Sequence, residues 1–256
     1  MPSAAGEPWN VRGGDMVWSR LRRGPAAPLP PLPGMCAYRR HVLGTEHLSF
    51  RTPETALDVV AVLAAAADPE AQQWLGSAEH EATAHLADAR IREAVLNVRP
   101  GDPASLRAAP WTRNMLTKSF EPTGEGEVLV GVRRDDGRYA GCIQLNPVLQ
   151  EIGGWLAPHA RGTGLGAELF RAALLLAHTH FGLRTVRAGY EPTNTASARA
   201  LAAAGFVPAD GPPTHTLENG REVEALWVRH VATGPASRCR GARPSAPSEP
   251  AGRPAS

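Results

Sequence analysis

Three glycines within five residues, Gly162, Gly164 and Gly166, constrain the fold of this chain more than any other segment. They follow a short stretch, residues 151–157, that is expected to form a strand, and they precede a long run with apolar residues at helical spacing. A helix begins with unpaired backbone N–H groups and about half a positive charge. Glycines let an anion approach the backbone because no Cβ stands in the way. The segment therefore predicts a phosphate-binding loop at the start of a helix.

The residues of this loop exclude one common phosphate site, and the spacing of its glycines argues against another. A P-loop needs Gly-Lys-Ser/Thr, and the only lysine of the chain is Lys118. A dinucleotide fingerprint has the spacing G-x-G-x-x-G inside a βαβ unit, whereas here the spacing is G-x-G-x-G after strands expected to be antiparallel. A plainer alternative stays open, in which the glycines make only a tight turn with close helix packing.

The order of expected elements indicates a mixed α/β (α+β) fold, with helices on the faces of one sheet. Alternating and β-branched stretches predict the strands, and hydroxyl or acidic caps followed by proline predict two helix starts, at Thr52 and Asp68. Gly76, Gly182 and Gly205 are expected to end helices. The expected strands are 47–51, 127–133, 139–145, 151–157, 185–190 and 222–228, and the expected helices follow Thr52 and Asp68 or span about 79–98, 164–181 and 195–204.

Composition separates the middle of the chain from its ends. Residues 1–44 and 232–256 are rich in Pro, Arg, Ala and Gly without an apolar period, so both are expected to be disordered tails around a single domain at 45–231. Pro28–Pro33 has a second interpretation, as a polyproline II ligand for a partner. The net charge of +2 gives no basic footprint for nucleic acid.

Location is expected to be cytoplasmic. The sequence has no secretory signal pattern and no run of about 18 apolar residues, so no membrane association is expected. Its three cysteines, Cys36, Cys142 and Cys239, have no framework spacing, which fits a reducing compartment. His178 and His180 stand two apart on an expected helix and do not share a face, so no metal site is expected.

Two motifs in order resemble a known family. Arg-x-x-Gly-x-Gly at 161–166 is followed by Asn194-Thr195-Ala196-Ser197 and then by Gly205-Phe206. Together they resemble the acetyl-CoA motifs of GCN5-related N-acetyltransferases (GNAT), over about residues 48–228. Trp74-Leu75-Gly76, the strand from Glu151 to Pro158 and the serine of Asn194-x-x-Ser197 look most like the RimJ/RimL branch. The resemblance implies the GNAT fold, a central mixed, mostly antiparallel twisted sheet flanked by helices, and acetyl-CoA as acetyl donor.

The resemblance also implies the residues that hold the cofactor. Backbone amides of the glycine loop would bind the diphosphate, and those at the end of the preceding strand would pair with the pantetheine arm and polarise the thioester carbonyl. Arg161 is either a charged phosphate contact or a solvated loop residue, and Asn194 is either a contact to the arm, a helix cap, or both. The implied cofactor residues are Leu156, Ala157, Arg161, Gly162, Thr163, Gly164, Leu165, Gly166, Asn194 and Ser197.

Two side chains are expected to move protons. Glu151 is the first choice for a general base toward the amine, with Glu127 and His159 as alternatives, and the plainer interpretation of Glu151 is an exposed strand end. Ser197 is placed by resemblance near the cofactor sulfur as an acid, and the tyrosine that many relatives carry four residues later is Leu201 here. Ser197 can also be a plain helix residue. Proximity alone can account for much of the rate, so neither group need be essential.

The acceptor is expected to be a primary amine, on a protein N-terminus or a small molecule, attacking directly in a ternary complex. Neither motif holds a cysteine for a covalent relay, and Cys142 is expected in the core. Trp111, Arg113 and Phe120 are candidates for the acceptor site, or belong to an ordinary surface excursion. Two alternatives in state and function stay open: monomer or homodimer, and a catalytically silent acyl-CoA-binding module in place of an enzyme.

Overall fold

The computed structural model describes residues 41–76, 86, 88–99, 102, 104–105, 127–217 and 219–234. Trp111, Arg113 and Phe120 lie outside these residues, as do most of the two expected tails.

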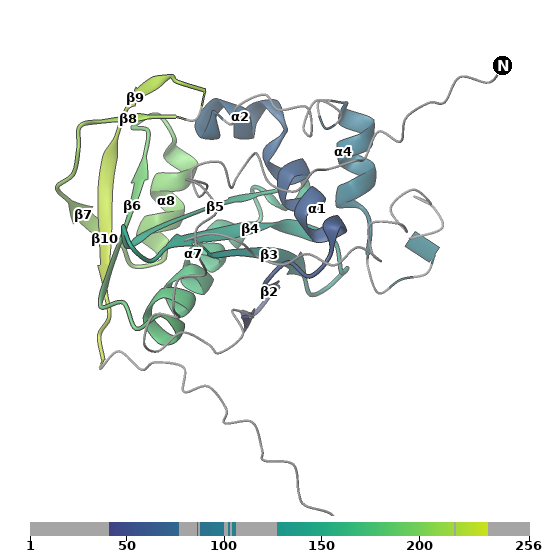
Figure 1. Cartoon of the computed structure of the whole chain (residues 1–256), viewed down its shortest axis with the longest axis horizontal. Helices are drawn as coiled ribbons and strands as arrows, with labels where there is room; N and C mark the ends of the chain where they lie inside the picture. The colour runs from purple at the N-terminus through teal and green to yellow at the C-terminus, as the bar shows by residue number, and fades with distance from the viewer. Residues whose placement is uncertain are drawn as a thin grey trace, which may run out of the picture.

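One eight-stranded sheet forms the centre of the molecule (Figure 1). Every neighbouring pair in it is antiparallel except β5–β6, which confirms the expected mixed, mostly antiparallel sheet. A separate two-stranded hairpin, β8–β9, stands beside it. In spatial order the strands are β1 (Val42–Gly44), β2 (Leu48–Arg51), β3 (Glu127–Arg133), β4 (Tyr139–Asn146), β5 (Glu151–Leu156), β6 (Thr185–Tyr190), β10 (Leu226–Val231) and β7 (Val207–Ala209), with the hairpin β8 (Thr214–Thr216) and β9 (Glu222–Glu224).

Helices cover both faces of this sheet and bury a separate apolar core on each (Figure 1). On one face the core is built around α1 and α4. On the other it is built around α7, against which α8 packs. The described helices are α1 (Ala56–Ala66), α2 (Pro69–Leu75), α4 (Ala89–Leu96), α7 (Leu165–Leu175) with its π-helical continuation η5 (Leu176–His180), and α8 (Thr195–Ala203), besides the short η4 (Pro158–Ala160).

Helix α1 begins three residues later than Thr52-Pro53-Glu54 suggests. Thr55 is the N-cap, and it forms a capping box with Asp58, each side chain bonding the other's backbone N–H. The buried Asp58 carboxylate also accepts hydrogen bonds from Arg51 at 2.6 Å and from the Tyr139 hydroxyl at 2.8 Å. The helix starts at the capping box and not at Thr52-Pro53, because the capping box satisfies more backbone donors and links the helix to the sheet through Asp58.

Helix α2 has the expected ends. Asp68 caps it by accepting from the amides of Glu70 and Ala71, and Pro69 opens its first turn. Gly76 ends it in the left-handed conformation with φ of 54°. This short helix lies along the rim of the sheet, beside the β8–β9 hairpin in Figure 1.

Helix α7 does not stay α-helical to Phe181 as expected. Its last five residues form a π-helix before Gly182, at φ 65°, ends the run. In this stretch His180 Nδ1 lies 3.0 Å from His41 Nδ1, and His178 Nε2 lies 3.0 Å from His230 Nδ1. His178 and His180 face different directions, as expected. His178 contacts His230 on β10, and His180 contacts His41, which directly precedes β1.

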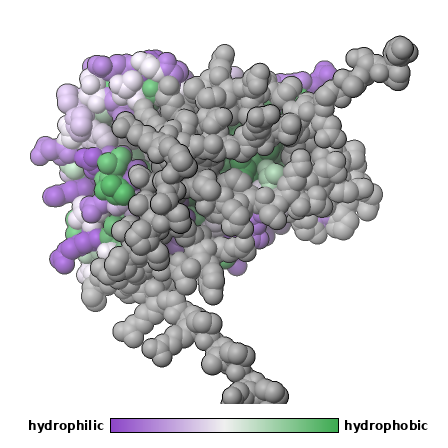
Figure 2. Space-filling model, in the orientation of Figure 1, coloured by the Kyte–Doolittle hydropathy of each residue, from purple (hydrophilic) through white to green (hydrophobic). Residues whose placement is uncertain are grey.

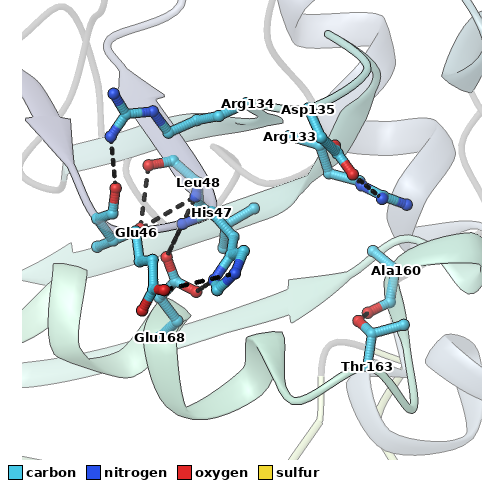
Figure 3. Close-up of polar contacts among 10 residues, drawn as sticks. Glu46, His47, Leu48, Arg133, Arg134, Asp135, Ala160, Thr163 and Glu168 are labelled. Carbon is cyan, nitrogen blue, oxygen red and sulfur yellow. Dashed lines mark hydrogen bonds and ion pairs between the residues drawn. The ribbon is translucent and has the colours of Figure 1, made fainter.

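The start of α7 is tied to strand β2 by Glu168. Its buried carboxylate accepts hydrogen bonds from the His47 amide at 2.6 Å, the Leu48 amide at 3.2 Å and His47 Nδ1 at 3.1 Å (Figure 3). Burial raises the pKa of this carboxyl, but hydrogen bonds from Thr45, His47 and Leu48 outweigh burial and lower it.

The folded part begins earlier than the boundary expected at Thr45. Val42–Gly44 pairs with β2, and His41 is buried, so this segment belongs to the sheet. The expected last strand, 222–228, is instead two strands of different sheets, because Ala225 donates to the Pro213 carbonyl at the point where the chain turns from β9 into β10. Composition gave no signal for either, since short edge strands lack a long apolar period.

The surface over β6–β10 is mostly hydrophilic, with a small apolar patch (Figure 2). Large exposed apolar side chains are scattered over several elements, which is usual for a protein surface. Among the described residues, no helix has both the length and the apolar character needed to span a bilayer.

Candidate functional site

The sheet opens between β5 and β6. Strand β5 pairs with β4 over its whole length, but it pairs with β6 only at Glu151, opposite Arg187. One more backbone bond, from the Arg187 amide to the Gln150 carbonyl at 2.9 Å, closes the bottom of the opening. Beyond it the side of β5 that faces β6 has no strand partner. Backbone groups on such an edge can pair with an extended ligand.

The amide of Leu156 is the better placed of the two expected backbone donors. The Ala157 amide donates to the Ala140 carbonyl of β4 at 2.8 Å, so it is already engaged inside the sheet. Successive amides of a strand point to opposite sides, which directs those of Leu156 and Gly154 to the open side. At Gly154 a Cβ would lie 2.6 Å from the Cys142 carbonyl oxygen, so glycine is required there.

The glycine loop has the form of an anion cradle. Gly162 and Gly164 have φ of 72° and 84°, and a Cβ at either would meet nothing within 4 Å. Gly164 is the N-cap of α7 and provides no capping side chain, so the first-turn amides, including that of Leu165, stay available. The Thr163 hydroxyl donates to the Ala160 carbonyl at 2.8 Å and holds the loop closed (Figure 3). Open space, free amides and a helix start together fit a diphosphate.

The third glycine has a different reason. A Cβ on Gly166 would lie 3.0 Å from the Ala200 Cβ, so its absence lets α7 and α8 pack closely. The plainer interpretation of the motif, close helix packing, therefore applies to Gly166 and not to Gly162 or Gly164.

A small cavity of about 160 Å³ lies between the opened strand and α8. Motif residues far apart in sequence meet around it, among them Leu156, Arg161, Gly166, Asn194 and Ser197. The Asn194 side chain accepts from the Ser197 amide at 3.0 Å and so caps α8, which leaves the Ser197 hydroxyl free of the cap. Leu201, at the place where relatives carry tyrosine, is buried in the core at 1% exposure and cannot face the cavity.

A larger cavity of about 340 Å³ lies on the other side of the same wall. Trp74, Leu75 and Trp155 line both cavities. The larger one adds carboxylates and aromatic rings from β5, from β6 and the residue that follows it, and from β9 and β10: Glu151, Tyr190, Glu191, Glu224 and Trp227. Its floor is partly bare backbone, at Gly153 and Gly189.

The sequence decides the family of a chain with this geometry. Residues 47–207 match the family described as Acetyltransferase (GNAT) domain, which is more than half of the 256 residues. The chain belongs to the GNAT family. The family prediction is confirmed, and the protein is an N-acetyltransferase that takes its acetyl group from acetyl-CoA.

Solved GNAT structures resemble this fold at low sequence identity. The ribosomal-protein-S5-alanine acetyltransferase of Vibrio fischeri is 16% identical, with a TM-score of 0.50, covering 76% of this chain and 98% of that one. RimL, a ribosomal L7/L12 α-N-protein acetyltransferase in complex with coenzyme A, is 13% identical, with a TM-score of 0.49 and coverage of 75% and 98%. Spermidine N-acetyltransferase of Vibrio cholerae is 14% identical, with a TM-score of 0.46 and coverage of 73% and 96%. No curated protein sequence matches the chain significantly.

Arg161 of the GNAT motif points away from the loop that it opens. Its guanidinium binds the Asp68 carboxylate through two parallel hydrogen bonds of 2.8 and 2.6 Å, and it reaches Glu70 at 3.1 Å. Its Nε donates to the Leu156 carbonyl at 3.0 Å. An arginine has five N–H donors, so at most one is left over for a phosphate.

Of the three candidate bases, Glu151 is the one that lines a cavity. Its carboxylate accepts from Arg187 at 2.8 Å, and the Arg187 guanidinium lies 4.8 Å from the centre of the Trp227 ring. Glu127 is buried at the start of β3 and lines neither cavity. His159 lies in η4, outside both cavities, where burial and the nearby Arg138 lower its pKa.

Sequence reasoning missed much of the larger cavity. Trp227, Glu191 and Glu224 belong to no local motif, and they reach the site only because β6, β9 and β10 come together there. Trp74 carried a signal, since it follows the capped start of α2 within one helical turn and a half. The sequence predicts that Trp74 lies on this helix, but it does not predict that Trp74 stands between two cavities.

Proposed function

We propose that this GNAT protein transfers the acetyl group to a primary amine bound in the larger cavity, by direct attack while donor and acceptor are both bound. The observation that carries the proposal is the wall shared by the two cavities, formed by Trp74, Leu75 and Trp155. The smaller cavity adjoins the glycine loop, and the larger one is lined by ionisable side chains. Two bound molecules can therefore meet across the open edge of β5. Holding both in reacting geometry supplies much of the rate.

Bound acetyl-CoA supplies a thioester whose carbonyl carbon an uncharged amine attacks, with cleavage of the C–S bond. The amides of Gly162 to Leu165 would hold its diphosphate, and the Leu156 amide would face the arm. An amine is protonated at neutral pH and must lose a proton before it attacks. Glu151, which lines the larger cavity, would accept that proton, directly or through water. The Ser197 hydroxyl lines the cofactor-side cavity and can give a proton to the leaving sulfur.

A cysteine relay has no support among the described residues. Cys142 is fully buried in the sheet, and burial raises the pKa of its thiol well above the usual range. The nucleophile in a thiol relay is the thiolate, which such a site disfavours. Direct transfer is the simpler route.

The charges of the larger cavity favour an acceptor with a single positive group. Glu151 is paired with Arg187 and Glu191 with Arg221, at 2.8 and 3.1 Å. Glu224 has no arginine partner within the described chain. One free carboxylate between aromatic walls suits an ammonium group on an otherwise uncharged body, such as a peptide N-terminus or a small monoamine, better than a polycation.

Titration of acetyl-CoA into the wild type and into Gly164→Glu tests the cofactor site. The variant places a carboxylate where the diphosphate is expected, so affinity should fall by about tenfold or more, or 1.4 kcal/mol. Gly220→Glu is the matched control, because Gly220 also has φ of 84° and open space around its Cβ, but lies on the β8–β9 turn. Equal affinity in both variants, or no binding by the folded wild type, would reject the site.

A panel of amines with acetyl-CoA then tests the acceptor class, with release of the free thiol as the signal. N-terminal peptides and monoamines should turn over faster than spermidine or aminoglycosides. Thiol release with none of these amines, from a protein that binds acetyl-CoA, would count against catalysis and favour a binding module.

A further inference from the structure

Helix α2 is held at both ends by arginines that come from other elements. Arg161, which opens the cofactor loop, binds its start through Asp68. Arg221, from the end of the β8–β9 hairpin turn, donates to the carbonyl of Gln73 in its last turn. The helix thus lies between the cofactor loop and the hairpin that covers the larger cavity.

The first anchor is the stronger of the two by geometry. A bidentate arginine–carboxylate pair is both directional and charge-assisted. The Asp68 side chain is only 8% exposed and that of Arg161 22%. Burial raises the pKa of the Asp68 carboxyl, but the hydrogen bonds and charge of Arg161 outweigh burial and keep the pKa below its usual value. The pair is therefore ionised and withdrawn from most of the solvent.

The second anchor is a group of contacts from the hairpin. The Asn219 amide donates to the Gly76 carbonyl at 2.8 Å, and Arg221 also reaches Glu191 at 3.1 Å. A Cβ on Gly76 would lie 2.9 Å from the Leu217 Cβ, so the hairpin packs directly on the end of the helix. The strands of this hairpin contribute Glu224 to the larger cavity.

The last turn of α2 forms part of the wall that both cavities share. Trp74 and Leu75 line the two, and Glu70 and Ala71 line the smaller one. With seven residues the helix is too short to hold itself in place, so its position is set by its anchors. A small movement of either end would reshape both cavities at once.

We infer that Arg161 is a positioning residue that holds α2 through Asp68, so that occupancy of the cofactor loop is transmitted along α2 to the β8–β9 hairpin over the acceptor cavity. The inference rests on the proposed function in one respect, that coenzyme A binds the glycine loop. It assigns the motif arginine to the acceptor side of the site and not to the phosphates. Coupling of this kind links two sites through one element whose position both of them influence.

Hydrogen exchange with and without coenzyme A tests the inference on the full chain, without an acceptor. In the wild type, coenzyme A should slow exchange in the glycine loop and also in the β8–β9 hairpin, by at least about fivefold in the hairpin. Asp68→Asn keeps the helix cap, because asparagine caps as well as aspartate, but loses the charge that holds Arg161. It should keep the slowing in the loop and lose it in the hairpin.

The matched control is Asp88→Asn, since Asp88 caps α4 in the same way, by accepting from the Arg90 amide, and lies on an exposed helix end. It should behave as the wild type. Arg221→Ala should behave like Asp68→Asn: coenzyme A should still slow exchange in the glycine loop but no longer in the β8–β9 hairpin.

Other results overturn the inference in different ways. A slowed loop with an unchanged hairpin in the wild type removes the coupling. Hairpin slowing that survives Asp68→Asn removes Arg161 from it. Loss of the loop effect in Asp68→Asn gives Arg161 a role toward the cofactor itself. No effect of coenzyme A anywhere in the folded wild type rejects the cofactor site, and with it the proposed function.

Discussion

Glu151 and Arg187 meet at 2.8 Å, side chain to side chain, at the one position where β5 pairs with β6. The strands separate immediately beyond this pair, so the two residues form the closed end of the opening in the sheet. Arg187 also packs on the Trp227 ring, which limits the rotation of both side chains. The Glu151 carboxylate, which lines the larger cavity, is thereby held in one place.

Replacing Glu151 by glutamine should reduce turnover and leave cofactor affinity unchanged. Glutamine keeps the size of the side chain and can still accept from Arg187, but it cannot accept a proton from the amine. The expected loss in kcat is about a hundredfold, within the usual range for a general base. Steady-state kinetics from pH 6 to 9, with acetyl-CoA titration alongside, measures it.

The companion variant Glu224→Gln should act on the amine KM more than on kcat, since Glu224 lines the cavity from β9 and not from the β5–β6 pair that holds Glu151. If Glu151→Gln retains full kcat at every pH, the base is dispensable and proximity accounts for the rate.

Ser197→Ala and Asn194→Ala should separate chemistry from helix capping. Ser197 takes part in the cap only through its backbone amide, so alanine there should leave the melting temperature unchanged and lower kcat. Asn194→Ala removes the acceptor of that bond and should cost about 1 kcal/mol of stability. Thermal melts and kcat values measured on both variants distinguish a role in catalysis from a role in helix capping. A Ser197→Ala enzyme with normal kcat would show that the thiolate leaves without help.

The buried carboxylate of Asp58 should be one of the most sensitive positions for stability. It accepts from Arg51, from Tyr139 and from the backbone amides of Glu54 and Thr55 just before α1. Asp58→Ala leaves Arg51 and the Tyr139 hydroxyl without their partner, and the free energy of unfolding should fall by about 3–5 kcal/mol. Tyr139→Phe removes one bond and should cost about 1–3 kcal/mol. Urea titration compares the two, and equal losses would contradict this ranking.

Acid should destabilise the fold through the histidines around the end of α7. Burial, followed by the neighbouring His180, lowers the pKa of His41 to about 4, and burial lowers those of His180 and His230. Above pH 6.5, the ordinary pKa of histidine, these side chains are neutral in both the folded and the unfolded protein, so their contribution to stability is fully present. As the pH falls from 6.5 toward 4, these histidines take up a proton in the unfolded chain before they do so in the folded protein. His41 alone should then lower the free energy of unfolding by about 1.4 kcal/mol per pH unit.

Urea midpoints at pH 7.5 and 5 measure this dependence. His41→Gln should flatten it, because glutamine keeps a polar group in the pocket without titrating. The same slope in the variant as in the wild type would assign the acid sensitivity to other groups.

The local signals in the sequence were strong where one segment decides its own structure. Asp68 with Pro69, and Gly76 at the far end, mark the two ends of α2 by local signals alone. Gly162 and Gly164 likewise specify a loop before a helix. These features depend on neighbours within a few residues, which a sequence displays directly.

The features that depend on distant partners were harder to predict. The sequence offered only a phosphate contact or a solvated loop residue for Arg161, because its partner Asp68 lies 93 positions earlier. The π-helix at the end of α7 has no local pattern, and its histidines find partners at His41 and His230. The walls of the larger cavity come from α2 and from six strands, β4, β5, β6, β8, β9 and β10, so no single stretch contains them.

The opening between β5 and β6 has a thermodynamic consequence. A sheet that leaves backbone donors unpaired on one internal side is completed when a ligand bonds to them, so the free energy of binding adds to the stability of the fold. At a hundred times the dissociation constant, this addition is about 2.7 kcal/mol. The lifetime of such a protein would then follow the supply of its own cofactor, since a chain short of acetyl-CoA would unfold more often.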